Sequence, residues 1–546
     1  WSEVLGIEKI GIHDNFFEVG GDSILAIRLV SKINKELNSQ VKVRDIFELR
    51  CVSKLGESIS KGFNISKKDE IYLPFSLVVK EHYKNIIPKS NLVEDIYPAS
   101  YLQLGMLLEP NLENNSTYHD VFSYSIKEKY DPHRALLIWK KLIKKHELLR
   151  ASFILSGDHG FDVVIHKKIE IDYYYFNIQN TTELIDKERL NDFKYEKSGL
   201  FRVIVNDLES SFDLIFSFHH AIADGWSIAS LINEFIQAYV NDKAIRPNVK
   251  LRYGEFIKNE TSAINNQNTI AFWKGYLNDI NVTEVNWKFD NERSKNSLYL
   301  SFFSLSAEQV KLVHNLSKSL KISVDTIFLL SYLKTLSFFT NSFDVTIGLI
   351  VNNRLEKEEG DKLFGLFLNT IPFRFDLNYQ KNDIGQLSEV FSSKLKLKKY
   401  QHLPYGYIKS LLRKDLYKFA FNFVHFHILN DSVNNIASFD GYERTSIPFT
   451  LSVSQHGDVG FSVNMSVHDD SISKGFLDYL ISYYKECLSS LLEGINSNLC
   501  LTKDDRKKIL RLWNQTETDY PTDQTIHQLF EEQVERTPNN IAVVYE

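Results

Sequence analysis

Apolar residues near the start of the chain recur at every fourth position. The stripe consists of Leu25, Leu29, Ile33 and Leu37. This spacing predicts an amphipathic helix that packs one face against a small core. A second short helix is expected just after it, with the apolar positions Val43, Ile46 and Phe47. Residues 1–60 are therefore predicted to form a compact helical unit.

Helix and strand patterns alternate through the long middle of the chain. A lysine-rich stretch, residues 61–90, precedes them and is interpreted as a linker. Helices are expected at Arg134–Leu149 and Val324–Leu336, and strands at Val163–Ile171, Leu200–Val205, Leu214–Phe218, Asp344–Val351 and Ile371–Phe375. This alternation, without a fixed internal repeat, predicts a mixed α/β fold over residues 91–500.

The last residues, 501–546, are charged and interrupted by turn formers. Tyr520, Pro521 and Pro538 break the pattern, as is typical of a second linker, and Ile541–Glu546 has the pattern of a strand just begun. The chain also starts at Trp1 without a methionine. We therefore expect it to be a piece of a longer polypeptide.

The composition is typical of a globular protein. The chain has 546 residues, 43% of them hydrophobic and 25% charged, and at about 150 residues per domain this predicts three to four folding units. A net charge of −6 gives no basic footprint for nucleic acid or an anionic membrane. The longest apolar stretch, 327–339, contains Lys334 and is too short to span a bilayer. With no signal peptide visible, a cytoplasmic location is the default expectation.

The strongest chemical signal lies where the expected strand Leu214–Phe218 ends. His219 and His220 follow it, and Asp224 and Gly225 complete the pattern His-His-x-x-x-Asp-Gly. An imidazole changes charge near neutral pH, so a positioned histidine can take up and release a proton within one reaction cycle. Adjacent side chains of a strand point to opposite faces. We therefore expect one histidine to face the interior and the other a solvent channel.

Two plainer interpretations compete with a catalytic one. The histidines could merely satisfy local hydrogen bonds, which the Asp-Gly at fixed spacing makes less favourable. His220 and Asp224 could also be two zinc ligands, but no third ligand has a recognisable spacing, and the three cysteines are scattered. No metal site is therefore predicted.

A second chemical signal lies in the first unit. Residues 16–23 read Phe-Phe-Glu-Val-Gly-Gly-Asp-Ser and place Ser23 on a glycine loop at the start of the first predicted helix. Glycines leave the hydroxyl uncrowded, and a helix N-terminus favours an attached phosphate. Helix capping by Asp22 and Ser23 is the alternative, since both residue types are common caps.

This unit resembles a peptidyl carrier domain of nonribosomal peptide synthetases. The resemblance is carried by Trp1–Gly6, Asn15–Phe17 and Gly20–Ser23. It implies that residues 1–60 form a small all-α helical bundle in which Ser23 carries a covalent 4'-phosphopantetheine cofactor. Within that family an aspartate at the place of Asp22 is often seen upstream of epimerisation domains, which raises a question for the next domain.

Most of residues 91–500 are similar to a condensation domain of the same synthetases. The motifs that carry the similarity are, in chain order, Ser100, Gln103, Gly105 and Met106; His146, Glu147, Leu149 and Arg150; Phe218–Ser227; Tyr253 and Phe256; Phe364, Gly365 and Phe367–Thr370; and His402–Tyr405. A seventh region, near Arg413 and Asp415, departs from the family pattern. The order and spacing of the motifs imply a two-lobed α/β fold that resembles chloramphenicol acetyltransferase, with lobes over 91–265 and 266–500.

Features outside the histidine motif favour condensation over related activities. Epimerisation domains share the fold and the histidines, but the motifs at 364–370 and 402–405 favour condensation, and the glutamate-rich epimerisation motif is not found. Heterocyclisation domains would replace the paired histidines by aspartates. The tail from Leu512 to Pro538 resembles the join between a condensation and an adenylation domain. Residues 501–546 are therefore expected to hold a linker and the start of an adenylation domain.

The resemblance implies peptide-bond formation between two carrier-bound thioesters. The amine of an acceptor aminoacyl group attacks a donor acyl thioester, with His220 as the catalytic residue, while His219 and Asp224 hold the loop. We expect Arg150 to pair with Asp224 and so tie the second motif to the third. An α-amino group titrates at about pH 8, so His220 should mainly orient the amine and take its proton. The backbone N–H near Gly225 is expected to help stabilise the oxyanion.

Two alternatives remain beside condensation. One is epimerisation, or combined epimerisation and condensation, of the carrier-bound residue. The other is a degenerate platform that recruits a second enzyme, against which the intact histidine motif argues. An L donor is favoured, because no epimerisation domain separates the carrier from the condensation domain. The implied partners are a phosphopantetheinyl transferase, neighbouring carrier and adenylation domains, and aminoacyl and peptidyl thioesters, in antibiotic or other secondary metabolism.

Overall fold

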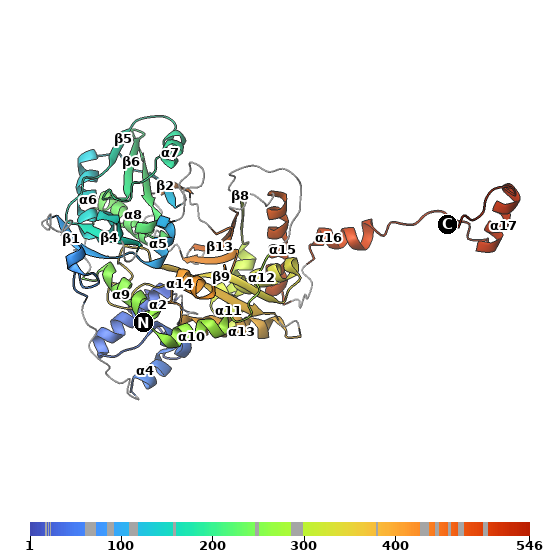
Figure 1. Ribbon diagram of the computed structural model, residues 1–546, viewed down its shortest axis with the longest axis horizontal. Coiled ribbons are helices and arrows are strands. Elements are labelled where there is room, and N and C mark those ends of the chain that lie inside the picture. The colour runs from blue at the N-terminus through green and yellow to red at the C-terminus, as the bar shows by residue number, and fades with distance from the viewer. Residues whose placement is uncertain are drawn as a thin grey trace. The chain divides into compact units, whose positions relative to one another are not determined.

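The computed structural model divides the chain into two compact units. These are Trp1–Asn498 and Leu499–Glu546 (Figure 1). The described residues are 1–16, 19, 21, 23–60, 72–83, 92–108, 118–156, 160–245, 250–285, 299–377, 380–425, 436–442, 447–456, 460–467, 474–494 and 501–545. Among them, no single helix is long and apolar enough to cross a membrane.

The first unit begins with a small helical bundle. Its helices are α1 (Ser2–Leu5), α2 (Ser23–Leu37), α3 (Val43–Leu49) and α4 (Val52–Ser60). The predicted apolar stripe lies on α2, and Leu29 packs with Phe16 and Ile46 in one buried core. Leu37 is 61% exposed because it is the last residue of the helix. The expected N-terminal helical bundle is confirmed.

A five-stranded sheet forms the centre of the first lobe. In spatial order its strands are β12 (Ile436–Tyr442), β2 (His119–Ile126), β7 (Phe212–His219), β6 (Phe201–Asp207) and β5 (Tyr173–Phe176). Every residue of β7 is buried. On one face, Trp139 of α6 (Pro132–Lys145) stacks on Phe216 of β7 and on Phe235 of α8 (Gly225–Val240). The two helices therefore cover the face of the sheet on which Phe216 lies.

Smaller elements complete this lobe. A three-stranded antiparallel sheet has the order β1 (Val93–Pro98), β4 (Gly160–His166) and β3 (Ala151–Ser156). The further helices of this lobe are α5 (Tyr101–Leu108), α7 (Thr181–Arg189) and α9 (Tyr253–Ile264). Helix α10 (Gln267–Tyr276) follows α9 and packs through Trp273 into the core of the second lobe. The expected helix Arg134–Leu149 ends earlier, at Lys145, because His146 is extended and leads into a 3-10 turn, Glu147–Arg150.

A six-stranded sheet forms the second lobe. Its order is β10 (Leu368–Asp376), β9 (Asp344–Asn352), β11 (Phe419–His425), β13 (Phe449–His456), β14 (Gly460–Val467) and β8 (Tyr299–Ser304). The helices are α11 (Ala307–Leu320), α12 (Val324–Thr340), α13 (Asp383–Lys398), α14 (Tyr405–Leu412) and α15 (Lys474–Leu492). β12 follows β11 in the chain but pairs with β2, so one strand crosses into the first lobe. The predicted α/β fold is confirmed.

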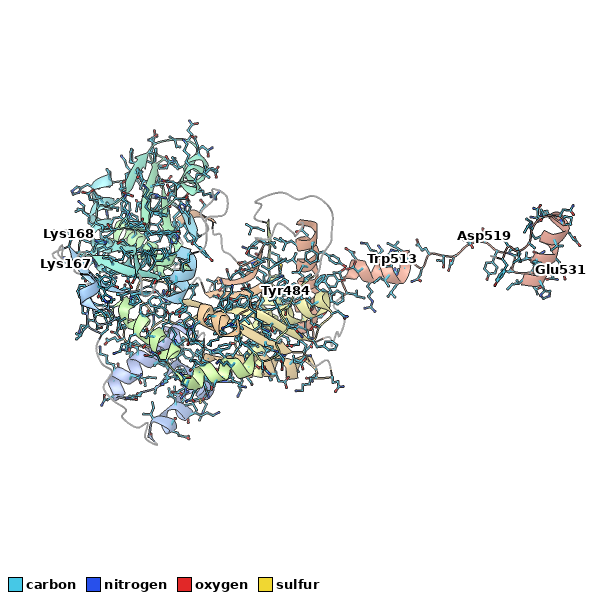
Figure 2. The ribbon with its side chains drawn as sticks, viewed as in Figure 1. Lys167, Lys168, Tyr484, Trp513, Asp519 and Glu531 are labelled. Atoms are coloured by element: carbon cyan, nitrogen blue, oxygen red, sulfur yellow. The ribbon has the colours of Figure 1, made fainter. Side chains whose placement is uncertain are left out.

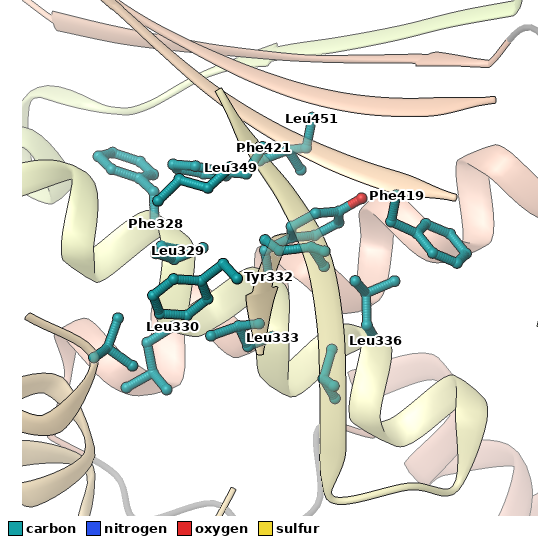
Figure 3. Packing of buried hydrophobic residues seen from close by; sticks show 14 of the residues in the cluster. Phe328, Leu329, Leu330, Tyr332, Leu333, Leu336, Leu349, Phe419, Phe421 and Leu451 are labelled. Atoms are coloured by element: carbon teal, nitrogen blue, oxygen red, sulfur yellow. The ribbon is translucent and has the colours of Figure 1, made fainter. Parts of the chain in front are cut away.

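Helix α12 is the centre of the second core. Phe328, Tyr332 and Leu333 pack with Leu349 of β9 and Phe421 of β11 (Figure 3). Lys334, the charge within this apolar stretch, is buried and pairs with Asp383 at the start of α13. The pairing compensates the charge that burial would otherwise disfavour.

The second unit is a short helical segment. It contains α16 (Lys503–Lys507), a π-helical turn (Lys508–Leu512) and α17 (Ile526–Arg536), and Figure 2 labels Trp513, Asp519 and Glu531 along it. The expected strand at Ile541–Glu546 is wrong over residues 541–545, which form none. A strand needs a neighbour for its backbone hydrogen bonds, and the described part of this unit contains no other strand.

The core of the second lobe gives a stability prediction. Tyr332 is fully buried, and its hydroxyl has no hydrogen-bond partner among the described residues. Because a buried unsatisfied hydroxyl is costly, we expect Tyr332→Phe to raise the free energy of unfolding by about 1 kcal/mol in chemical denaturation. Tyr484→Phe is the control, since the Tyr484 hydroxyl donates to the carbonyl of Phe328. Equal losses of stability in both variants would contradict the prediction.

Candidate active site

The histidine motif joins strand β7 to helix α8. His219 is the last residue of β7, His220 opens a 3-10 turn (His220–Ile222), and Asp224 is the N-cap of α8. The Asp224 carboxylate accepts a hydrogen bond from the backbone N–H of Ser227 at 2.8 Å. An aspartate in this place satisfies one of the free N–H groups at the start of a helix. Gly225 is the first residue of α8.

The two histidines differ in burial, as strand alternation predicts. His219 is buried, and burial, followed by the proximity of His220 and His119, lowers its pKa to about 3. Its Nδ1 accepts a hydrogen bond from the backbone N–H of Ala221 at 3.2 Å, which shapes the turn. The side chain of His220 is 16% exposed, and its Nδ1 lies 3.1 Å from Oδ2 of Asp120 in β2. His219 therefore stays neutral, and His220 is the imidazole that can exchange a proton.

Asp224 pairs with Arg354, and the expected pair with Arg150 is wrong. Nη2 of Arg354 lies 2.8 Å from Oδ1 of Asp224, and neither side chain is more than 1% exposed. Arg150 leads into β3, where its guanidinium donates to Glu94 and to the carbonyl of His166. These two partners belong to the three-stranded sheet and hold Arg150 there.

The first and fifth motifs close around the same loop. Gln103 of α5 donates to the carbonyl of Ala221 at 2.8 Å. The N–H of Asp224 donates to the carbonyl of Gly365 at 3.1 Å, and the N–H of Phe367 donates to the Asp224 carboxylate at 3.2 Å. Both lobes therefore hold the loop that carries His220.

Hydrogen bonds connect the second motif to the fourth, and the fourth to the fifth. Glu147 accepts from the backbone N–H of Tyr253 at 2.5 Å, and the Tyr253 hydroxyl donates to the carbonyl of Leu366 at 2.6 Å. Burial raises the pKa of Glu147 to about 7. A Cβ on Gly365 would lie 2.6 Å from the Tyr253 ring, so only glycine fits there. The motifs thus form one connected network.

The sixth motif is bound to the fifth through one amide. The Asn369 side chain donates to the carbonyls of Gln401 and Leu403, at 2.8 Å each, and accepts from the N–H of Tyr405 at 3.1 Å. This amide fixes the turn before α14. Burial lowers the pKa of His402, which lies in this turn.

Ser23 is the first residue of helix α2. Of the preceding loop, Gly20 and Asp22 lie outside the described residues, as does the side chain of Ser23. The backbone N–H of Gly21 donates a hydrogen bond to the carbonyl of Phe16 at 2.8 Å, and a Cβ at Gly21 would lie 2.4 Å from the Phe16 ring. Gly21 is therefore packed tightly against Phe16, and residue 23 lies at a helix N-terminus, where a phosphate is favoured.

The helical bundle contacts the lobes beside the histidine loop. Arg28 of α2 lies 2.5 Å from the Asp361 carboxylate, and the indole N–H of Trp226 donates to the carbonyl of Asp361 at 3.1 Å. Trp226 packs against the core of the bundle. The N–H of Val43 donates to Glu356 at 3.1 Å. Trp226 follows Gly225 directly, so the bundle touches the first turn of α8.

Sequence reasoning missed two residues, Arg354 and Asp120. Arg354 is 130 positions from Asp224, and no local spacing links the two. Asp120 is the one acidic residue of β2 and lies next to His119, which is the signal that could have found it. Among the described residues, no group of three acidic, histidine or cysteine side chains is placed to hold a metal ion.

Two family models match the chain. Residues 1–59 match a phosphopantetheine attachment site, and residues 93–510 match a condensation domain. Bacitracin synthase 3 of Bacillus licheniformis is 26% identical over 578 residues, covering 100% of this chain and 9% of that protein. Gramicidin S synthase 2 of Brevibacillus brevis is 26% identical over 569 residues, covering 100% of this chain and 12% of that protein. The chain thus spans less than a quarter of either relative.

Solved structures share the fold. A condensation domain from a monacolin K polyketide synthase has a TM-score of 0.66 at 14% identity, covering 73% of this chain and 98% of its own. A four-domain nonribosomal peptide synthetase bound to AMP and glycine has a TM-score of 0.66 at 15% identity, covering 82% of this chain and 37% of its own.

The buried ion pair gives the prediction for this site. Asp224→Asn leaves Arg354 buried without its counter-charge, so we expect a loss of about 3–5 kcal/mol in the free energy of unfolding. A double-mutant cycle of Asp224→Asn with Arg354→Met should show strong coupling, and the same cycle with Arg150→Met should show almost none. Coupling to Arg150 in place of Arg354 would contradict the observed pairing.

Proposed function

Since the chain belongs to the condensation-domain family and carries a phosphopantetheine attachment domain in front of it, we propose that it forms a peptide bond from a donor held on Ser23. The acceptor is an aminoacyl group on a second carrier. One observation carries the proposal: His220, a partly exposed imidazole beside a buried carboxylate, stands at the loop that the other motifs hold.

The reaction needs one proton transfer to His220 and one proton transfer from it. The acceptor amine attacks the thioester carbonyl carbon, and His220 accepts a proton from the amine nitrogen as the C–N bond forms. The C–S bond then breaks, and the departing sulfur takes the proton back from His220 as a thiol. The N–H groups at the start of α8 stabilise negative charge on the carbonyl oxygen. His219 and Asp224 act by holding the loop.

The residues around position 23 fit a phosphopantetheine group. The first turn of α2 offers backbone N–H groups to a phosphate, and the loop before it is compact at Gly21. When attached, the cofactor supplies the thiol that carries the donor. In this chain Ser23 would be its attachment residue.

The docked bundle supports a donor role for the fused carrier. Arg28 lies five residues after Ser23 on α2, about 7.5 Å along the helix. Its partner Asp361 also holds Trp226 at the first turn of α8. The helix that begins at Ser23 is therefore fixed against the helix that begins beside the histidine loop. We infer that the donor enters from this side.

The larger assembly is inferred from the relatives. Their names are those of peptide synthases, and this chain covers a small part of each. We infer a longer synthetase with neighbouring carrier and adenylation domains, and an adenylation domain that begins within residues 501–546. Loading of Ser23 would need a phosphopantetheinyl transferase. The use of coenzyme A for loading favours a cytoplasmic location.

Loss of the His220 imidazole should abolish most of the activity. Ser23 is loaded from aminoacyl-coenzyme A conjugates, and aminoacyl-N-acetylcysteamine thioesters serve as acceptors. We expect His220→Ala to lower the rate of amide formation by roughly 10²- to 10⁴-fold, with an unchanged unfolding midpoint. Ser23→Ala is the control and should gain no cofactor mass. An unchanged rate in His220→Ala would rule out its role, and a racemised donor without amide product would favour epimerisation.

Carrier docking gives a separate prediction. Arg28→Glu places like charges against Asp361 and should slow amide formation on the order of 10-fold, because the donor helix loses its attachment. The double variant Arg28→Glu/Asp361→Arg restores opposite charges and should recover most of the rate. Intact mass of each variant checks that Ser23 is fully loaded. If the reversed pair is as slow as Arg28→Glu alone, the contact does not hold the donor.

A further inference from the structure

Strand geometry places Asp120 and His220 on one face of the central sheet. β2 and β7 are antiparallel, with His119 opposite His219 and Asp120 opposite Phe218. Paired residues share a face, and successive residues alternate. Asp120 and Phe218 therefore lie on the face opposite to His119 and His219. The backbone N–H of His220 continues the pairing by donating to the carbonyl of Tyr118 at 2.8 Å, which places His220 on the face of Asp120.

The face opposite to His220 has its own polar network. His119 contacts the Ser217 hydroxyl at 2.7 Å, that hydroxyl donates to Glu188 at 2.6 Å, and Arg202 pairs with Glu188 at 2.5 Å. On that face, the charge of Glu188 is thus compensated by Arg202. Asp120, on the face of His220, is not part of this network.

Asp120 is a buried carboxylate that lies beside the imidazole of His220. The residue is 2% exposed, and within the described residues no lysine or arginine lies at ion-pair distance from it. A buried carboxylate without a cation is costly. The contact of 3.1 Å to Nδ1 of His220 is an electrostatic approach rather than a straight hydrogen bond. Such a contact favours a proton on Nδ1 and stabilises the imidazolium.

We propose that Asp120 is a positioning residue that holds His220 with its proton on Nδ1, so that Nε2 is the basic nitrogen. This role rests on the proposed peptide-bond formation. A neutral imidazole could otherwise carry its proton on either nitrogen, and only the form with a free Nε2 can accept a proton there. When Nε2 takes the amine proton, the carboxylate stabilises the positive ring. When the proton passes to the departing sulfur, the ring returns to the same tautomer.

The first test needs no substrate. Histidine labelled with ¹³C at Cε1 reports ring titration in ¹H–¹³C spectra, and the His220 signal is identified by its loss in His220→Gln. Asp120 from β2 lies 3.1 Å from Nδ1 of His220, and His219 from β7, which is paired with His119, interacts with it electrostatically. Removing the carboxylate in Asp120→Asn should move the His220 titration to lower pH by about 1 unit or more.

Matched variants separate this role from general damage to the sheet. Asp213 is a buried acid of β7, and its carboxylate accepts from Ser125 and Thr181 at the end of the strand away from His219. Asp213→Asn should leave the His220 titration unchanged. Asp120→Glu keeps the negative charge, so its His220 titration should lie between those of Asp120→Asn and the wild type. A His220 titration that is the same in Asp120→Asn and wild type would overturn the proposal.

The kinetic test shows whether the contact matters for the reaction. Asp120→Asn should lower kcat for amide formation by about 10- to 100-fold, the range found for carboxylates behind metal-bound histidines. KM for the acceptor thioester should change little, and the acid limb of the rate profile should move to lower pH with the titration. If wild type forms no amide, the proposed function fails together with this role. If wild type is active and Asp120→Asn equals it, only the role of Asp120 fails.

Discussion

The buried ion pair between Asp224 and Arg354 is the contact on which the site depends. Taking both charges out of water is costly, and only short contacts in good geometry compensate for it. The Asp224 carboxylate pairs with Arg354 and accepts hydrogen bonds from the N–H of Ser227 in its own helix and from the N–H of Phe367. The guanidinium of Arg354 also lies over the Phe367 ring. The contacts of Asp224 with Arg354 and with the N–H of Phe367 join the first lobe to the segment after β9. The lobes therefore cannot shift at this point without exposing or unpairing a charge, and the loop that carries His220 stays in place between them.

This constraint explains why two adjacent histidines have different properties. The turn that Asp224 ends keeps His219 in the interior, where burial removes its charge, and leaves His220 at the edge of the packed region. The first turn of α8 then serves three purposes. It has backbone N–H groups at its start, its Ser227 N–H donates to the Asp224 carboxylate, and through Trp226 it contacts the helical bundle. In the proposed function, this short segment would link the carrier to the loop of the proton-transferring histidine.

Local spacing predicted the elements, and it failed where structure depends on distant pairing. The stripe on α2 and the apolar run of β7 are local signals, and both elements form as expected. The crossing of β12 to β2 joins residues far apart in the chain, and the apparent strand after residue 540 lacks a neighbour. The motifs named the residues of the site but not their partners. Arg150 belongs to a motif, and we therefore predicted that it pairs with Asp224, but it pairs with Glu94. Arg354, the observed partner of Asp224, follows a strand and belongs to none of the motifs. Asp120 is visible in the sequence only as the one acid of a strand with mixed apolar and polar residues.

Intact mass spectrometry of the wild-type chain shows directly whether it transfers a donor from Ser23 to an acceptor amine. Ser23 is loaded with a donor of known mass through coenzyme A, and a series of aminoacyl thioesters is then added, one at a time, as acceptors. We expect the donor mass to leave the loaded chain and to appear on an acceptor through an amide bond, at a rate well above hydrolysis. A donor that stays on Ser23, or that leaves only by hydrolysis, with every acceptor in the series would contradict peptide-bond formation by this chain.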